Sequence, residues 1–458
     1  MILFICLLIS FISIILIITS TNKRLFSPPL IFCFFYIAFF QIWALFPEIA
    51  TTYGFDVSYL KRPNYQYNQI MMTMVLFLFS MGVVTANRVY SFKPKNEYRA
   101  FVSDRWIDDI NWPEYRFAFL MILFFSIGVV FVFFKLKGIP LMAYKDAIYN
   151  KSGIYSAMGE ARIGSQRGSG YLLQGVTLFL PFCSTILLMK YNASRKNLHL
   201  LSALALSSLT VFSMLLLTSR GHFAIFFVIL LMAQQLYSKK INYKILFRFL
   251  LLFIALFVLV TLFREGLFRQ ESSEPSILHT LGYVFFYRFS QPYYQLINTF
   301  ELYSNTGAEF FFGLSYLKDI IAILPGAQLG FNGMLYLLLY PGGTIGTTAT
   351  VGIVGEAFCN FGIIGVLMIP FFWGTFMQWF YIKYVRSIRR LSTLVYYTFM
   401  STYLAKAAGN GIGAILSEPV ISISCLYILY KFTAQYFRYL MKKEQDSYSL
   451  ISLQASRT

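Results

Sequence analysis

Residues 350–382 read TVGIVGEAFCNFGIIGVLMIPFFWGTFMQWFYI, a run that contains one charged residue, Glu356. A helix of about 20 apolar residues is long enough to cross the hydrocarbon core of a bilayer. Inside lipid every backbone polar group must find a partner within the protein, which a helix provides. The run therefore predicts a membrane-spanning helix with a single carboxylate near its beginning.

Similar apolar runs occur along the rest of the chain. Of its 458 residues, 58% are hydrophobic and 12% are charged, with a mean hydropathy of +0.63, which is typical of polytopic membrane proteins. We predict an all-α integral membrane protein, a single domain over residues 1–458, with about eleven transmembrane helices (ten to twelve). The predicted spans cover about 2–19, 27–46, 68–86, 117–135, 171–189, 200–218, 222–237, 246–263, 350–382, 391–407 and 414–432.

Basic residues predict the orientation of these spans. The first run has no basic residue before it and ends at Lys23 and Arg24, so it resembles an anchor with an outer N-terminus and not a cleavable signal peptide. If successive spans cross the membrane in alternate directions from this outer N-terminus, 24 of the 38 Lys and Arg residues lie on the cytoplasmic side, where such residues are retained. The C-terminal tail, 437–458, is then cytoplasmic. Its apolar residues show no regular helical spacing, which predicts disorder. The net charge of +19 follows from topology and gives no support to nucleic-acid binding.

Three loops are long enough to have their own structure or role. The largest, 264–347, is predicted outside, with an amphipathic helix over 277–303, a short helix over 314–324 and an apolar run at 334–339 that is too short to span. Such helices lie in the interface or dip back into the protein, as a lid or as the floor of a cavity. A second outer loop covers 136–170, and the inner loop 87–116 is interpreted as a solvated linker.

The cysteines and histidines show no metal-binding pattern. All five cysteines lie in or beside apolar runs without a CxxC spacing, so we interpret them as small core residues. None of the three histidines has a His or Cys partner at ligand spacing, and no DxD motif occurs. We therefore expect neither a metal nor a cofactor.

Cations concentrate on the predicted outer face. Arg220, Arg264 and Arg288 are the main candidates for binding a diphosphate, because a guanidinium is always charged and its forked donors match phosphate oxygens. The alternative is that each snorkels to lipid head groups. Secondary candidates are Arg162, Arg167, Lys318 and Lys406, the first two within the glycine-rich segment 159–170.

Two residues are candidates for a catalytic base. Glu356 lies near the outer end of its span, where partial burial favours proton acceptance near neutral pH. His222, in the turn Thr218-Ser219-Arg220-Gly221-His222, is the second candidate. The alternative for Glu356 is a structural role as the partner of an arginine.

Several segments in chain order resemble those of a known family, the O-antigen polymerases (Wzy-type polymerases of oligosaccharide repeat units). They are Ser219-Arg220-Gly221, Phe263-Arg264-Glu265-Gly266, Arg288 followed by Phe-Ser-Gln-Pro, Gly313-Leu314-Ser315-Tyr316, Leu324-Pro325-Gly326, and the segment 355–362, GEAFCNFG. The Arg-x10-Gly pattern of some members is absent from the outer loops.

The resemblance implies a GT-C-like glycosyltransferase of the bacterial inner membrane with a periplasmic active site. Its substrates would be undecaprenyl-diphosphate-linked oligosaccharides, joined into O-antigen or a related polysaccharide by transfer of the growing chain to a new lipid-linked unit. It also implies that Arg220, Arg264 and Arg288 hold the diphosphate. A chain-length regulator and a flippase are the implied protein partners, beside the membrane lipids.

Two other functions stay open. An O-antigen ligase shares the large outer loop and the arginines. A flippase for lipid-linked oligosaccharides, or another transporter, would have cations deep within its spans and matched broken helices in two halves, and the sequence shows neither pattern.

Overall fold

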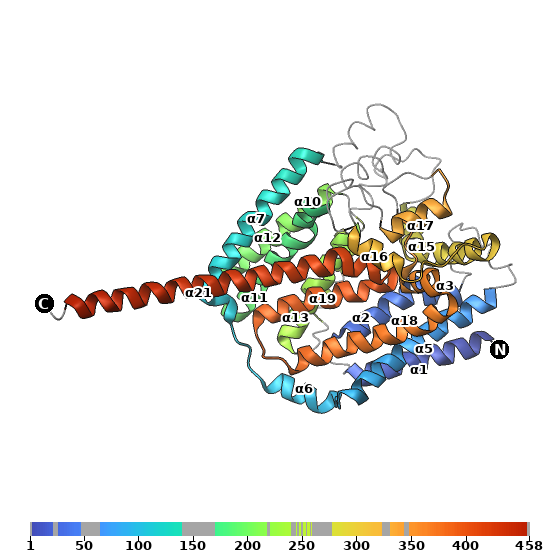
Figure 1. The fold of residues 1–458 in the computed structure, drawn as a ribbon, viewed down its shortest axis with the longest axis horizontal. Helices are drawn as coiled ribbons and strands as arrows, with labels where there is room; N and C mark the ends of the chain where they lie inside the picture. Colours follow the sequence, from blue (N-terminus) through green and yellow to red (C-terminus); the bar gives the residue numbers. More distant parts are fainter. Residues whose placement is uncertain are drawn as a thin grey trace.

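The computed structural model describes residues 2–21, 26–46, 65–139, 170–217, 220–239, 277–322, 330–342 and 348–455, together with isolated positions between 244 and 258. These residues form a bundle of helices (Figure 1). In chain order the elements are α1 (Ile2–Thr21), α2 (Pro28–Tyr36), η1 (Ile37–Gln41), α3 (Ile42–Leu45), α5 (Tyr65–Val89), α6 (Pro94–Ser103), η3 (Asp109–Asn111), α7 (Pro113–Lys137), α10 (Gly170–Gln174), η4 (Gly175–Phe179), α11 (Leu180–Ser194), α12 (Asn197–Leu216), α13 (Arg220–Ser238), α15 (Ile277–Thr306), α16 (Leu314–Ile321), α17 (Phe331–Leu339), α18 (Gly352–Arg386), α19 (Leu391–Asn410), α20 (Ile412–Ile415), η6 (Leu416–Val420) and α21 (Ile421–Ala455).

Eight helical segments within the described ranges are long and apolar enough to cross a membrane. They match the first seven predicted spans and the run at 350–382, so the prediction of an all-α polytopic membrane protein is confirmed. The predicted span 246–263 falls largely outside the described residues. The predicted spans at 391–407 and 414–432 are helical, as α19 and α21, but are not among the eight. The count of eleven therefore stays a prediction.

Helices α5 and α18 cross at close range. Gly82 faces the carbonyl oxygen of Phe371, and Gly374 faces that of Phe79, so closely that neither glycine has room for a Cβ atom. Small residues at such crossings allow two backbones to approach each other within a membrane. The hydroxyl of Thr375 also donates to the carbonyl oxygen of Gly82, at 3.2 Å. These contacts with α5 fix the position of α18, which contains most of the apolar run 350–382.

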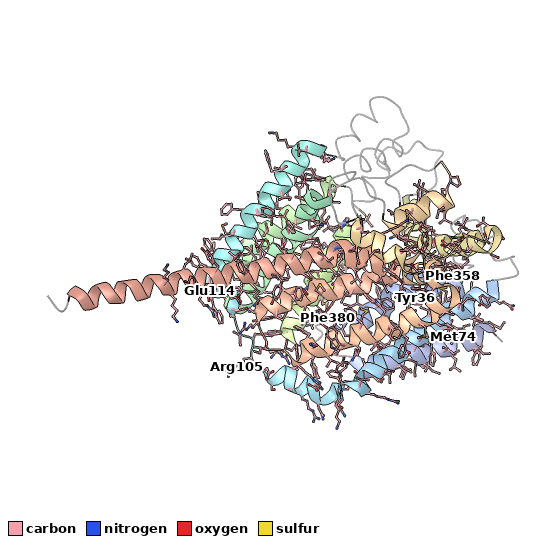
Figure 2. All side chains as sticks on the ribbon, viewed as in Figure 1. Tyr36, Met74, Arg105, Glu114, Phe358 and Phe380 are labelled. Atoms are coloured by element: carbon pink, nitrogen blue, oxygen red, sulfur yellow. The ribbon has the colours of Figure 1, made fainter. Side chains whose placement is uncertain are left out.

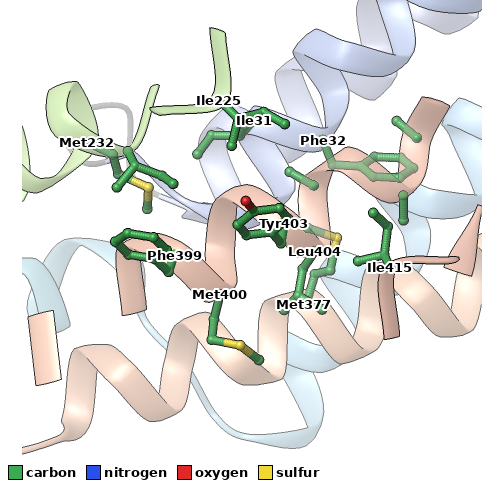
Figure 3. Close-up of a cluster of buried hydrophobic side chains, with 14 of the residues drawn as sticks. Ile31, Phe32, Ile225, Met232, Met377, Phe399, Met400, Tyr403, Leu404 and Ile415 are labelled. Carbon is green, nitrogen blue, oxygen red and sulfur yellow. The ribbon is translucent and has the colours of Figure 1, made fainter. Parts of the chain in front are cut away.

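Helix α19 lies at the centre of the bundle and is buried along most of its length. Figure 3 shows Phe399, Met400, Tyr403 and Leu404 of α19 among apolar side chains from α2, α13, α18 and α20. Four of the five cysteines are buried, as predicted, whereas Cys425 is exposed. The other helices thus shield α19 from the surroundings.

The bundle has two distinct ends, which we name by their elements. The α6 end carries α6, η3 and the last turns of α5 and α18, and the cap end carries α15, α16, α17 and the first turns of α18 (Figure 1). In Figure 2 Arg105 lies towards the α6 end and Phe358 towards the cap end. The predicted inner loop 87–116 and the described part of the predicted outer loop 264–347 thus lie at different ends.

The segment 87–116 is exposed over much of its length, as expected of a solvated linker, but it is also partly folded into the bundle. It contains α6 and η3 and buries Phe101, Asp109 and Ile110. The Asp109 carboxylate accepts from the backbone N–H of Ser392 at 3.0 Å and forms an ion pair with Lys431 at 3.4 Å. Ser392 of α19 and Lys431 of α21 therefore provide the hydrogen-bond donor and the counter-ion that the buried Asp109 carboxylate needs.

The predicted disorder of the tail is not what the structure shows. Helix α21 continues without a break to Ala455 and extends well beyond the rest of the bundle (Figure 1). The segment contains no Gly or Pro and includes good helix formers such as Met441, Lys442 and Glu444, so an apolar period is not needed to continue the helix.

Candidate functional site

Helix α18 is broken at Phe361 and Gly362, within the apolar run 350–382. Gly362 has φ 61° and ψ −147°, a conformation that strongly favours glycine. The break releases the carbonyl groups of Cys359 and Asn360, which accept from the backbone N–H groups of Phe311 and Phe312 at 2.9 and 3.0 Å. A short helical segment, 352–360, is thereby set apart from the long remainder of α18.

Asn360 connects this short segment to α16. Its Oδ1 accepts from the backbone N–H of Gly313 at 2.9 Å. Its Nδ2 donates to the Ser315 hydroxyl at 2.6 Å and to the carbonyl oxygen of Glu356 at 2.8 Å. One buried amide side chain therefore positions the beginning of α16 beside Glu356.

A second break lies at Gly411, between α19 and α20, where φ is 88°. Beyond it, the backbone N–H groups of Ile412 and Gly413 donate to the Glu356 carboxylate, with Gly413 N at 3.0 Å from Oε1. Glu356 is only 1% exposed. The carboxylate is thus held between two helix breaks, and both of its oxygens accept hydrogen bonds.

A second buried carboxylate, Asp319 of α16, faces the first. Its Oδ1 accepts from the backbone N–H of Phe331 at 2.7 Å, whereas its Oδ2 is buried without a hydrogen-bond partner. Gly413 lies between the acids, since a Cβ atom there would collide with both Asp319 Oδ2 and Glu356 Oε1. The two oxygens are therefore no more than about 5 Å apart, a separation at which two negative charges repel by about 3 kcal/mol for an effective dielectric constant of about 20. We call Asp319 and Glu356 the carboxyl pair.

The carboxyl pair has no counter-charge in the part of the chain that the structure describes, since no Lys, Arg or His there forms an ion pair with either acid. Burial raises the pKa of Asp319 to about 6, and the Phe331 N–H opposes this rise. Burial also raises the pKa of Tyr316, one helical turn before Asp319, with Glu356 and Asp319 adding to the effect. The site therefore favours uncharged forms of these groups.

The predicted phosphate-binding residues are only partly described. Arg220 is the first residue of α13 and Arg288 lies within α15, and their side chains are outside the described set. Arg264, Arg162 and Arg167 lie wholly outside the described residues. Their convergence on one ligand stays a prediction.

The other candidates lie on three different helices. Lys318 is exposed on α16, where its Nζ lies 3.2 Å from the Met334 sulfur and 5.8 Å from the Phe311 ring centre. Lys406 is half-buried on α19, with Nζ 5.9 Å from the Tyr403 ring centre. His222, half-buried near the start of α13, is not among the hydrogen-bond partners of Glu356. Of the predicted site residues with described side chains, Glu356 alone belongs to the carboxyl pair.

Asp319 and Asn360 are not among the site residues predicted from the sequence. A signal for Asp319 was present, because Ser315 and Asp319 are four residues apart and form one polar face of a short helix. The structure buries this polar face and exposes the apolar face, which is formed by Leu314, Leu317, Ile320 and Ile321. In a membrane the apolar face belongs towards lipid, so the polar face marks the interior.

A shallow apolar cavity of about 390 Å³, largely open to the surface, adjoins the α18 break. Its lining comes from the end of α15, the segment after it and the break itself: Phe300, Tyr303, Ser304, Phe310, Phe358, Phe361, Gly362, Ile363 and Ile364. Phe358 lies two residues from Glu356, so the short segment 352–360 contacts both the cavity and the carboxyl pair. The arrangement suits a ligand with an apolar chain and a polar head.

Among the described side chains, no group of three or more His, Cys, Asp or Glu residues is placed to hold a metal ion. Chemically, the carboxyl pair can accept or release a proton, and Asn360 and the backbone N–H groups fix its geometry. No protein-family model, no curated protein and no solved structure matches the chain.

Proposed function

We propose that this protein is a membrane glycosyltransferase that polymerises lipid-linked oligosaccharide units. Its substrates would be undecaprenyl-diphosphate-linked oligosaccharides, and the product O-antigen or a related polysaccharide at the periplasmic face of the bacterial inner membrane. The main support is the short segment 352–360, which contacts an apolar cavity on one side and the carboxyl pair on the other. A lipid-linked sugar needs an apolar surface for its lipid chain and polar groups for its head.

In this proposal Arg220, Arg264 and Arg288 neutralise the diphosphate as it leaves. Fixed cations at a low-dielectric boundary stabilise developing negative charge without reorganisation, so the reaction needs no metal. Glu356, together with Asp319, accepts the proton from the sugar hydroxyl that attacks. Glu356 is buried beneath α16, so α16 must shift for a hydroxyl to approach.

The test is polymer synthesis by the purified full chain in lipid nanodiscs, with lipid-linked repeat units as the substrate. We expect Arg264→Ala, Arg288→Ala and Glu356→Gln each to lower the rate at least about 100-fold, the usual size of a general-base or charge-stabilising contribution. Arg99→Ala and Glu309→Gln, at exposed positions, are the matched controls. Wild-type chain lengths from both arginine variants would refute the diphosphate role, and loss of activity in EDTA would refute the metal-free mechanism.

One observation favours a second candidate, a transporter such as a flippase for lipid-linked oligosaccharides. Transporters place binding sites at discontinuous helices, and here two breaks, at Gly362 and Gly411, flank a buried carboxyl pair. Movement of a fluorescent lipid-linked oligosaccharide across the bilayer without any polymer would support the transporter. Transfer of finished glycan to lipid A core, without polymer, would instead indicate a ligase.

A further inference from the structure

The carboxyl pair joins four helical elements that meet at the cap end. Asp319 belongs to α16, and its Oδ1 accepts from Phe331 N at the beginning of α17. Glu356 belongs to α18 and accepts from the backbone N–H groups of α20. A change in the charge of the pair therefore acts on all four elements at once.

We propose that Asp319 and Glu356 together bind a single proton, and that this shared proton keeps α16 and α17 seated on α18 and α20. The proposal concerns the free protein and does not rest on the polymerase function.

The geometry favours a proton as the ligand. Asp319 is 4% exposed, and its buried Oδ2 has no donor within the described structure while it faces Gly413 and the Glu356 carboxylate. A proton on one acid removes the repulsion between two like charges at this separation. A sodium ion would need several more oxygen ligands, and the Tyr316 hydroxyl is a further side-chain oxygen with an electrostatic link to both acids.

Other titratable groups on the elements that pack here are few. Helix α16 carries Tyr316 and the exposed Lys318, α18 carries Cys359, and α17 carries Tyr336. Lys406 on α19 and Glu418 in η6 are charged residues of neighbouring elements, and α20 has none. Helix α15, which packs against α17 and α18, carries His279, Arg288 and Glu301. In aqueous peptides Lys, Cys and Tyr side chains titrate above pH 8, His near pH 6.5 and Glu near pH 4. The rise in the pKa of Asp319 to about 6 therefore places the pair in a range that His279 shares.

The contacts of α16 explain why losing the proton would release it. Its apolar face points away from the protein, and Ser315 and Asp319 are the residues that it buries. The Ser315 hydroxyl accepts from Asn360, but Asp319 faces a second carboxylate. When both acids are ionised, one of the two buried polar anchors of α16 becomes repulsive.

The experiment measures the distance between α17 and a fixed point on the bundle as pH changes. Spin labels are placed at Leu338, exposed on α17, and at Ile388, exposed just beyond α18, in the full chain in nanodiscs. Cys425 is replaced by Ser because it is the exposed cysteine, whereas the other four are buried and protected from labelling. Distances are recorded by double electron–electron resonance at pH 5 and pH 8.5.

We expect one narrow distance at pH 5 and an additional longer distance at pH 8.5. Asp319→Asn and Glu356→Gln each replace one acid of the pair by an amide that cannot ionise. Both variants should therefore keep the pH 5 distance distribution at both pH values. Glu309→Gln, which removes an exposed carboxylate near the same end, should respond like the unsubstituted chain.

Three results would overturn the proposal. The first is an unchanged distribution between pH 5 and pH 8.5 in the unsubstituted chain, which needs no variant to fold. The second is a distance change that follows the exchange of K⁺ for Na⁺ at constant pH, which would indicate a sodium site. The third is a distance change between pH 5 and pH 8.5 in both Asp319→Asn and Glu356→Gln that equals that of the unsubstituted chain.

Discussion

Buried acids occur at both ends of the bundle, but their surroundings differ. At the α6 end, Asp109 is fully buried and has Lys431 as counter-ion, with the Ser392 N–H as a further donor. At the cap end, Asp319 and Glu356 are buried beside each other with backbone N–H groups as their hydrogen-bond donors. Burying a charge is costly unless it is paired. The acid with a counter-ion therefore serves structure, and the pair without one among the described residues is the better candidate for function.

Removal of the counter-ion at the α6 end should have the largest effect on stability. Lys431→Met leaves Asp109 buried without a cation and removes the donor to Ser392 Oγ at 2.8 Å and to Tyr115 Oη at 2.9 Å. Breaking a buried pair in this way costs about 3–5 kcal/mol. We expect a large fall in the thermal unfolding midpoint in detergent, while Lys442→Met, at an exposed position of the same helix, changes little. Equal midpoints for both variants would show that Asp109 does not need its partner.

At the cap end, removal of a charge should have the opposite effect. The folded-state pKa of Asp319, about 6, exceeds its ordinary value of 3.8, so its stabilising contribution is complete below about pH 3.8 and is lost as pH rises through about 6. Asparagine keeps an oxygen for the Phe331 N–H and cannot ionise. We expect Asp319→Asn to match the unsubstituted chain at pH 4 and to be more stable at pH 7 by up to about 3 kcal/mol.

Thermal unfolding at the two pH values measures this difference, with Glu309→Gln as the control. A stability difference that is the same at pH 4 and pH 7 would contradict the assignment, because it would not come from titration of Asp319.

The amide that positions α16 should have a smaller effect. Asn360→Ala removes the hydrogen bonds to Gly313 and Ser315 and leaves buried polar groups unsatisfied, at a cost of about 2 kcal/mol. We also expect faster hydrogen exchange of the Gly313 amide, measured by mass spectrometry. Unchanged exchange there would show that α16 is held by other contacts.

The smallest effect is expected at an exposed pair of the α6 end. Arg386 pairs with Glu97 at 2.6 Å, but its side chain is 41% exposed. Exposed ion pairs contribute under about 1 kcal/mol. Arg386→Gln should therefore shift the unfolding midpoint only slightly, and less in high salt. A shift as large as that of Lys431→Met would mean that burial does not separate the two kinds of pair.

The apolar runs predicted the helices well because lipid leaves a spanning segment little choice other than a helix. The same run that predicted a span at 350–382 did not predict its break, since the φ of Gly362 depends on partners such as Phe311 and Phe312 that are distant in sequence. Glu356 stood out as a lone charge within an apolar run. Asp319 did not, because its burial depends on α17 and α20 packing over one face of α16.

Helix α21 is long enough to report the orientation of the whole molecule. A helix of 35 residues that rises about 1.5 Å per residue is about 52 Å long, whereas a hydrocarbon core is only about 30 Å thick. Part of α21 must therefore project as a rod, as its red end does in Figure 1. A small rigid tag fused in helical register to its end would be visible in single-particle images. The angle between that tag and the plane of the nanodisc would give the tilt of the whole bundle relative to the membrane.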